Sequence, residues 1–209
     1  MVLVGGKPII WHIMQIYIQQ GFNDFVIATG YKHDVIEEWI GSLSVEVKAK
    51  ALFTGLETQT GGRIKRCIEL EPEQEFFVTY GDGVGNIDLK KLLASHRDAG
   101  RLATVTAVRP PSRFGVLEIH SNRVVHFGEK NQANSGWING GFFVINREVA
   151  SIIQNDSVLF ETGPLPRLAE ENELTAHLHN GFWQPMDTLR ERNLLNELSK
   201  NEPPPWLEF

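Results

Sequence analysis

The chain has a single cysteine, Cys67, among its 209 residues. One thiol excludes an intramolecular disulfide and a zinc site built from several cysteines. No apolar run approaches the ~18 residues that a helix needs to cross a bilayer, and the first residues lack the pattern of a signal peptide. We therefore expect a cytoplasmic protein with no membrane partner.

The chain also lacks an excess of positive charge. Its formal net charge is -6, which argues against nucleic acid as the main partner, because lysines and arginines must neutralise the phosphates. With 42% hydrophobic and 22% charged residues, the composition is that of a globular protein with a real core. The length suits one domain, residues 1–209.

The motifs of common hydrolases and zinc enzymes are missing too. The sequence shows no Ser-His-Asp order and no nucleophile elbow. None of the seven histidines pairs with a carboxylate or cysteine at metal-ligand spacing, and His177 with His179 would give only two ligands. This favours a reaction that needs positioning and charge neutralisation rather than a strong base, as phosphoryl and nucleotidyl transfer do.

The most informative segment that is present is Phe76–Gly83, an apolar run that ends in Gly81-Asp82-Gly83. The run predicts a buried strand, and open α/β sheets bind ligands at the carboxyl ends of their strands. A carboxylate at such a place suits a hard cation such as Mg2+. The alternative is a plain Gly-Asp-Gly turn.

Helical and strand-like segments alternate through the first half of the chain, which is typical of βαβ units and a mostly parallel sheet. Apolar periodicity predicts helices at 8–21, 33–40, 61–70 and 89–99. The strands predicted there are 25–29, 76–79 and 103–108, with weaker candidates at 45–47 and 51–53. The second half predicts strands at 115–119, 124–127, 142–145 and 174–177, helices at 149–154 and 166–173, an irregular segment at 181–187 and a peripheral helix at 188–199.

Four further segments carry groups that could bind a substrate. Gly61-Gly62-Arg63 at a helix start offers N–H groups and a cation to an anion, unless it is a simple turn. Glu129-Lys130 is either a binding pair or solvated surface charge. Asn139-Gly140-Gly141 places an amide and flexible backbone at the start of a strand. Asp187 lies in Trp183–Thr188, whose large side chains also suit a hydrophobic plug.

Several phrases of the sequence occur together in one family of enzymes. They are Lys7-Pro8-Ile9-Ile10-Trp11-His12-Ile13-Met14, Thr60-Gly61-Gly62-Arg63, Thr79-Tyr80-Gly81-Asp82-Gly83-Val84, Ile138-Asn139-Gly140-Gly141-Phe142-Phe143-Val144 and Gly181-Phe182-Trp183-Gln184-Pro185-Met186-Asp187-Thr188. The chain resembles the sugar-phosphate nucleotidylyltransferases, most closely their cytidylyltransferase group. The resemblance runs nearly end to end, and the last phrase is the most specific.

The resemblance implies a Rossmann-like α/β fold: a mostly parallel sheet with helices on both faces and a small mixed β region over the ligand cleft. The implied reaction transfers CMP from CTP to glucose 1-phosphate, giving CDP-glucose and pyrophosphate, with Mg2+ as cofactor. We expect these two substrates as the small-molecule partners, and a homo-oligomer.

The resemblance also implies roles for individual residues. Asp82 and Asp187 would be catalytic and would hold the Mg2+. The nucleotide would contact Thr58, Gly61, Arg63 and Gly81. The sugar-phosphate pocket would be formed by Gly115, Glu129, Lys130, Asn139 and Gly140. In that pocket Glu129 would accept glucose hydroxyls and Lys130 would hold the phosphate.

The chain departs from the family at its start. Members open with a strand and a Gly-rich loop containing Gly-Thr-Arg, then Pro-Lys-Pro, and that loop cradles the triphosphate. None of this precedes Met1, and the connection from Ile40 to Thr58 is shorter than usual. The sequence is a truncated piece, mobile segments are omitted from it, or the protein is an inactive paralogue. A non-catalytic nucleotide-sugar binding or regulatory subunit and a uridylyltransferase remain rival functions.

Overall fold

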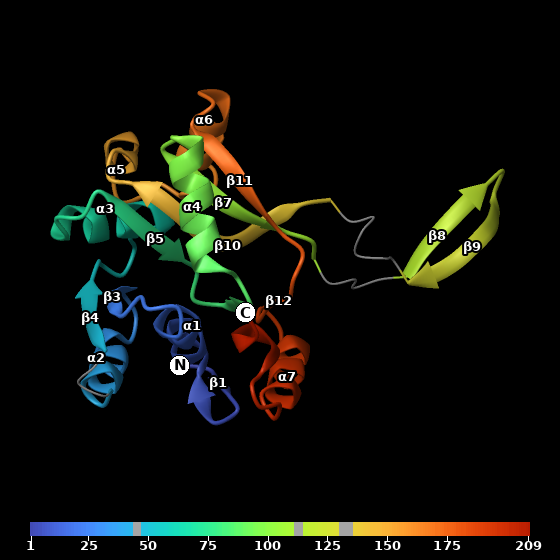
Figure 1. The fold of residues 1–209 in the computed structure, drawn as a ribbon, viewed down its shortest axis with the longest axis horizontal. Coiled ribbons are helices and arrows are strands. Elements are labelled where there is room, and N and C mark those ends of the chain that lie inside the picture. The colour runs from blue at the N-terminus through green and yellow to red at the C-terminus, as the bar shows by residue number, and fades with distance from the viewer. Residues whose placement is uncertain (44–46, 111–114, 130–135) are drawn as a thin grey trace.

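The computed structural model describes residues 1–43, 47–110, 115–129 and 136–209 (Figure 1). Its helices are α1 (Ile9–Ile18), α2 (His33–Gly41), α3 (Thr60–Leu70), α4 (Leu89–Ala99), α5 (Val149–Ile152), α6 (Pro164–Glu170) and α7 (Leu189–Leu198), followed by the 3₁₀ turn η2 (Pro205–Leu207). Its strands are β1 (Leu3–Val4), β2 (Lys7–Pro8), β3 (Asp24–Thr29), β4 (Lys48–Phe53), β5 (Glu75–Thr79), β6 (Gly83–Gly85), β7 (Ala103–Val108), β8 (Gly115–His120), β9 (Arg123–Glu129), β10 (Ile138–Asn146), β11 (Leu174–His179) and β12 (Trp183–Pro185).

A four-stranded sheet in the order β11-β7-β10-β5 forms the centre of the fold. Strand β11 runs parallel to β7, whereas β10 runs antiparallel to both β7 and β5. The predicted α/β fold is confirmed: β11, β7 and β5 run in one direction, and β10 alone runs against them. The reason is the connection from β7 to β10: its described part is the β8–β9 hairpin and contains no crossover helix, which a parallel return would need.

Strand β10 separates the two hydrophobic cores, because successive side chains of a strand point to opposite faces. Phe142 and Val144 pack in one core with side chains of α1 and α4. Phe143 and Ile145 pack in the other core with side chains of α3, α5 and α6. All four side chains are at most 1% exposed, and burying each stabilises the fold by ~1.5–3 kcal/mol. The sheet is therefore covered on both faces.

The C-terminal segment packs into the first of these cores. Leu195 of α7 and Trp206 of η2 are fully buried there beside Val4 and Ile13. The helix expected at 188–199 therefore forms, but it is not merely peripheral. Helix α7 ends at Leu198, and the chain turns back in η2, where Trp206 is buried in the core.

Strands β3 and β4 form a separate parallel pair that packs against α2. Residues 44–46, which hold most of a weakly predicted strand, lie outside the described residues, and β4 is longer than the predicted 51–53. The segment 181–187 is more regular than expected, because Trp183–Pro185 form β12 and pair with β6. No helix among the described residues is long and apolar enough to cross a bilayer.

Candidate active site

A hollow of about 180 Å3 lies where three segments of the chain meet. It is lined by Tyr80, Asp82, Gly83, Asn139, Gly140, Gly141, Phe142, Trp183, Pro185 and Asp187. The structure thus brings together Asp82, Asp187, Asn139 and Gly140, all of them predicted site residues. Asp82 follows the end of β5, where the sequence placed it.

Pairing of two short strands brings the two aspartates to the same hollow. In the antiparallel β6–β12 pair, Gly83 lies opposite Pro185, and just beyond it Met186 N donates a 2.7 Å hydrogen bond to the Asp82 carbonyl. Asp82 and Asp187 therefore flank the same end of this ladder. An added Cβ at Gly81 would meet no described atom within 4 Å, so space is left for a ligand beside Asp82.

Asp187 is fixed by the start of α7. The carboxylate of Glu191 accepts hydrogen bonds from the backbone N–H groups of Asp187, at 2.8 Å, and of Thr188, at 3.0 Å. In return the Thr188 hydroxyl accepts from Glu191 N at 3.2 Å. This capping box satisfies donors that the helix itself cannot pair, and it holds the backbone from which the Asp187 side chain projects.

The electrostatics of the hollow favour a cation. Partial burial, and then the charge of Asp187, raise the pKa of the Asp82 carboxyl above its usual value. Two carboxylates in one hollow repel each other, and a divalent ion between them removes that repulsion. Two carboxylates plus substrate oxygens are also the donor set that Mg2+ takes in phosphate-transferring sites. The residues present therefore fit the expected Mg2+.

Asn139–Gly141, at the irregular start of strand β10, also lines the hollow, and this segment is held by three hydrogen bonds. The Asn139 amide oxygen accepts from Gly141 N at 2.8 Å. The indole N–H of Trp183 donates to the Gly140 carbonyl at 2.8 Å, and Tyr80 N donates to the Gly141 carbonyl at 3.0 Å. Gly141 has φ +77°, a conformation that favours glycine, so the irregular start of β10 depends on this residue type.

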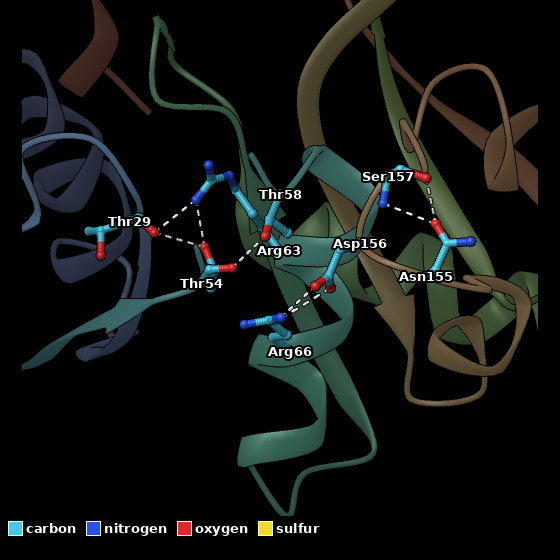
Figure 2. A network of polar contacts seen from close by, with 8 residues as sticks. All are labelled: Thr29, Thr54, Thr58, Arg63, Arg66, Asn155, Asp156 and Ser157. Atoms are coloured by element: carbon cyan, nitrogen blue, oxygen red, sulfur yellow. Dashed lines mark hydrogen bonds and ion pairs between the residues drawn. The ribbon is translucent and has the colours of Figure 1, made fainter. Parts of the chain in front are cut away.

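Two of the residues predicted to contact the nucleotide, Thr58 and Arg63, lie in a different network, which Figure 2 shows. Arg63 donates from Nη1 to the Thr29 carbonyl at 2.8 Å and to the Thr54 hydroxyl at 2.5 Å. The Thr58 hydroxyl donates to the Thr54 carbonyl at 2.5 Å. These bonds tie the carboxyl ends of β3 and β4 to helix α3. Neither Thr58, Arg63 nor Gly61 lines the hollow.

The sequence suggested that the N–H groups of Gly61-Gly62 could bind an anion, but in the structure the Gly61 N–H has a partner within the protein. Gly61 N donates to the Val158 carbonyl at 3.0 Å. An added Cβ at Gly61 would lie 2.6 Å from that carbonyl oxygen, and one at Gly62 would lie 2.6 Å from Asp156 Cα. The glycines thus allow the segment after α5 to lie directly on α3, where Arg66 and Asp156 form an ion pair (Figure 2).

The remaining sugar-phosphate candidates are Gly115, Glu129 and Lys130. Gly115 and Glu129 face each other in register at the base of the β8–β9 hairpin, which projects away from the rest of the described chain in Figure 1. Lys130 lies outside the described residues.

Sequence reasoning missed two polar side chains beside the hollow. The Tyr80 hydroxyl donates to the Glu161 carboxylate, and the Thr60 hydroxyl donates to the other oxygen of that carboxylate at 2.7 Å. The position of Tyr80 directly before Gly81-Asp82 could have indicated that it lies at the site. Glu161 carries no local signal, because it reaches the site only through the packing of the segment after α5 on α3.

Fold and site together define an α/β protein whose acidic, glycine-walled hollow suits a phosphate-bearing substrate with a divalent cation. Residues 1–188 match the family described as nucleotidyl transferase. The glucose-1-phosphate cytidylyltransferase of Salmonella typhimurium is 42% identical over 99% of this chain and 89% of its own length. The chain therefore belongs to the nucleotidyl transferase family.

Two further comparisons agree with this assignment. A probable glucose-1-phosphate cytidylyltransferase of Bacillus subtilis is 36% identical over 94% of this chain and 85% of its own length. The crystal structure of HddC from Yersinia pseudotuberculosis superposes with a TM-score of 0.75, at 24% identity, over 94% of this chain and 88% of that one. This structural likeness supports the fold, which is Rossmann-like as the sequence predicted.

Proposed function

We propose that this protein transfers CMP from CTP to glucose 1-phosphate, forming CDP-glucose and pyrophosphate. The observation that carries the proposal is the 42% identity over 99% of the chain to a glucose-1-phosphate cytidylyltransferase. The meeting of Asp82 and Asp187 in one hollow supports it, because the transfer needs a place where phosphate charge is neutralised. We take residues 1–209 as a single nucleotidyltransferase domain.

In this proposal a phosphate oxygen of glucose 1-phosphate attacks the α-phosphorus of CTP in line. A new P–O bond forms, the bond to the bridging oxygen of the β-phosphate breaks, and pyrophosphate leaves. The nucleophile is already mostly dianionic near neutral pH, so no general base is required. Asp82 and Asp187 would hold Mg2+, which supplies neutralisation of phosphate charge when bound.

The nucleotide is proposed to lie against the segment that Thr58, Gly61 and Arg63 hold in place, with Gly81 beside the phosphates. The hydrogen bonds of Arg63 and Thr58 to Thr54 and Thr29 support a rigid wall there. A rigid wall favours binding of the nucleotide, because it loses little freedom when the nucleotide binds.

The sugar phosphate is proposed to contact Gly115, Glu129, Lys130, Asn139 and Gly140. A carboxylate that accepts sugar hydroxyls contributes ~1.5–3 kcal/mol per charged hydrogen bond. We therefore expect Glu129→Ala to raise the KM for glucose 1-phosphate roughly 10- to 150-fold while the KM for CTP changes less than about twofold. Steady-state kinetics with each substrate varied in turn measure this. Equal increases in both KM values would instead indicate a surface ion pair or a general folding defect.

We also propose a homo-oligomer that works in the cytoplasm, where nucleoside triphosphates are made. The hairpin supports self-association, since its apolar side chains Ile119, Val124 and Val125 are between 53% and 62% exposed. Apolar side chains gathered on one hairpin are unusual on a monomer surface. Light scattering of the purified protein tests the oligomeric state, and a monomeric mass would contradict it.

The decisive experiment measures pyrophosphate release with each of the four ribonucleoside triphosphates, with glucose 1-phosphate and Mg2+ present. We expect turnover with CTP well above the other three, and CDP-glucose as the product by mass spectrometry. Preference for UTP would identify a uridylyltransferase. Binding of CDP-glucose without turnover of any triphosphate would identify a non-catalytic nucleotide-sugar binding protein.

A further inference from the structure

Arg109 and Trp137 form a stacked pair next to the segment Asn139–Gly141. The guanidinium carbon of Arg109 lies 4.2 Å from the centroid of the Trp137 ring. Arg109 directly follows β7, and Trp137 directly precedes β10. The pair therefore stands at one end of the β7–β10 ladder, one step beyond the position where Ile138 lies opposite Val108.

The register of this ladder puts the stacked pair on the same face of the sheet as Asn139. Asn139 lies opposite Ala107, and residues directly opposite each other in an antiparallel ladder share a face. Side chains two positions apart along a strand also share a face, at a separation of roughly 6–7 Å. Arg109 is two positions from Ala107, and Trp137 is two positions from Asn139. The pair therefore continues the wall that Asn139 contributes to the hollow.

A phosphate group that enters the hollow meets an acidic lining. Among the residues that the structure describes, those lining the hollow include the carboxylates of Asp82 and Asp187 but neither a lysine nor an arginine. The phosphate of a sugar phosphate is mostly dianionic near neutral pH, so its binding there depends on positive charge. The Arg109 guanidinium brings such a charge to the end of the wall.

Stacking on the indole prepares the Arg109 guanidinium for a phosphate. A guanidinium is planar and its five N–H donors lie in its plane, so the contact of its face with the ring uses none of them. Groups of this kind hold phosphate through two parallel hydrogen bonds. The stack also restricts a long side chain before the substrate arrives, which lowers the entropy cost of binding. Trp137 is 38% exposed and Arg109 is half-buried, so the pair is open to a ligand.

We propose that Arg109 binds the phosphate of glucose 1-phosphate and that Trp137 is a positioning residue, which holds the Arg109 guanidinium in place. Trp137 acts through Arg109 and not by touching the substrate. The inference rests on the proposed function, in which Asn139 and Gly140 belong to the sugar-phosphate pocket. It adds to that pocket a cation from the end of β7, which sequence reasoning did not single out.

Steady-state kinetics of Arg109 variants test the phosphate contact. Arg109→Ala should raise the KM for glucose 1-phosphate roughly 10- to 150-fold, the scale of one charged hydrogen bond, with the KM for CTP unchanged within about twofold. Arg109→Lys keeps the charge but loses the planar donors, so it should recover only part of the affinity. Inorganic phosphate that competes with glucose 1-phosphate should inhibit Arg109→Ala about tenfold more weakly than the wild type. Equal inhibition of both would assign Arg109 to the sugar hydroxyls and overturn the proposal.

A double-mutant cycle with Arg109 tests the role of Trp137. Trp137→Leu should raise the KM for glucose 1-phosphate about two- to fivefold, the scale of an exposed cation–π contact. Trp137→Phe, which keeps an aromatic face, should restore most of the affinity. In the Arg109→Ala background, Trp137→Leu should have no further effect, because the group that it positions is gone. An effect that persists in this background means that the indole contacts the substrate itself, and it overturns the positioning role.

Arg147→Ala is the matched control. Arg147 directly follows the other end of β10, and its guanidinium carbon lies 5.7 Å from the centroid of the Phe76 ring. It is not among the residues that line the hollow. The substitution removes an arginine–ring contact of the same kind and should leave both KM values unchanged. A rise in the KM for glucose 1-phosphate as large as that of Arg109→Ala would mean that losing either contact disturbs β10 as a whole, and it would refute the inference.

Two other results for Arg109→Ala would also overturn it. An equal rise in both KM values means a general defect, and a rise in the KM for CTP alone assigns Arg109 to the triphosphate. If the wild type forms no CDP-glucose, the proposed function fails, and the inference is then read on the rise in Tm that glucose 1-phosphate produces. Arg109→Ala should lose this rise and Arg147→Ala should keep it. A wild type with neither turnover nor that rise refutes both proposals.

Discussion

Replacing Asp82 by asparagine should lower the turnover of the enzyme and, in the absence of metal, raise the stability of the folded protein. Asp82 is more than one third exposed, and the pKa of its carboxyl is raised first by partial burial and then by the charge of Asp187. At neutral pH the protein without metal therefore holds two repelling carboxylates in one hollow. Asparagine keeps the shape of the side chain and removes one of the charges.

The sign of the effect on stability follows from proton linkage. The folded pKa of Asp82 lies above that of the unfolded chain, so the native state binds more protons between the two values, and stability falls as pH rises through that window. At pH values above this window, the ionised Asp82 carboxylate destabilises the folded state by the full amount, and Asp82→Asn removes this destabilisation. Solvent screening at this exposed site keeps the gain below ~0.5 kcal/mol, which corresponds to ~1–2 °C in Tm.

The effect on catalysis should have the opposite sign and be much larger. Losing one electrostatic contact to a transition state typically costs ~100- to 1000-fold in turnover, and we expect at least ~100-fold for Asp82→Asn and for Asp187→Asn. Thermal melts at pH 8 and pH 4, with and without Mg2+, combined with pyrophosphate release, measure both effects. Mg2+ should raise the Tm of the wild type and of neither variant.

Asp98→Asn provides the control, because Asp98 is an exposed aspartate of α4 that does not line the hollow. It should change neither turnover nor the response to Mg2+. Near-normal turnover of both site variants at saturating Mg2+ would refute the metal assignment. An Asp82→Asn protein that melts below the wild type at pH 8 would refute the argument from charge repulsion.

Three further predictions concern stability, and thermal or urea unfolding tests each. Gly62→Ala should lower the free energy of unfolding by ~1–3 kcal/mol, because the new Cβ would lie 2.6 Å from Asp156 Cα. Gly41→Ala is the control: its Cβ would have no described atom within 4 Å, so stability should not fall. Equal melting temperatures of the two variants would contradict the prediction. Thr188→Ala should lose ~1 kcal/mol with its cap, and serine should restore it. Burial lowers the pKa of His12, so below about pH 6.5 the unfolded chain binds more protons than the folded protein. The free energy of unfolding should therefore fall as the pH is lowered, and His12→Gln should make this fall smaller. An unchanged dependence of stability on pH in the variant would disprove the prediction.

Local pattern was sufficient to predict most elements of this fold. The periodicity of apolar residues places α1, α3, α4 and β10 within a few residues of their observed bounds, because each element buries a face that its own spacing defines. The position of Asp82 after a buried strand was equally readable, since a strand, a turn and a carboxylate are consecutive in the sequence.

Strand direction and the meeting of distant segments were decided only by the tertiary structure. The apolar pattern of β10 alone does not distinguish a parallel from an antiparallel neighbour, because both bury the same side chains; the direction of β10 follows from its connection to β7, whose described part is the β8–β9 hairpin without a crossover helix. The β6–β12 ladder that joins Asp82 to Asp187 uses strands of three residues each, too short to carry a periodic signal. Such strands form because the rest of the fold brings them within hydrogen-bonding distance.

The contacts of Tyr80 and Gly62 show the same limit for single residues. A tyrosine before Gly-Asp-Gly and a glycine pair at a helix start are visible in the sequence, but their partners Glu161 and Asp156 come from a segment far along the chain. Hydrogen bonds and close backbone contacts act over a few ångströms, so they depend on which segments pack together. The sequence therefore determined the kinds of groups at this site, and the packing of β5, α3 and the segment after α5 decided which of them touch.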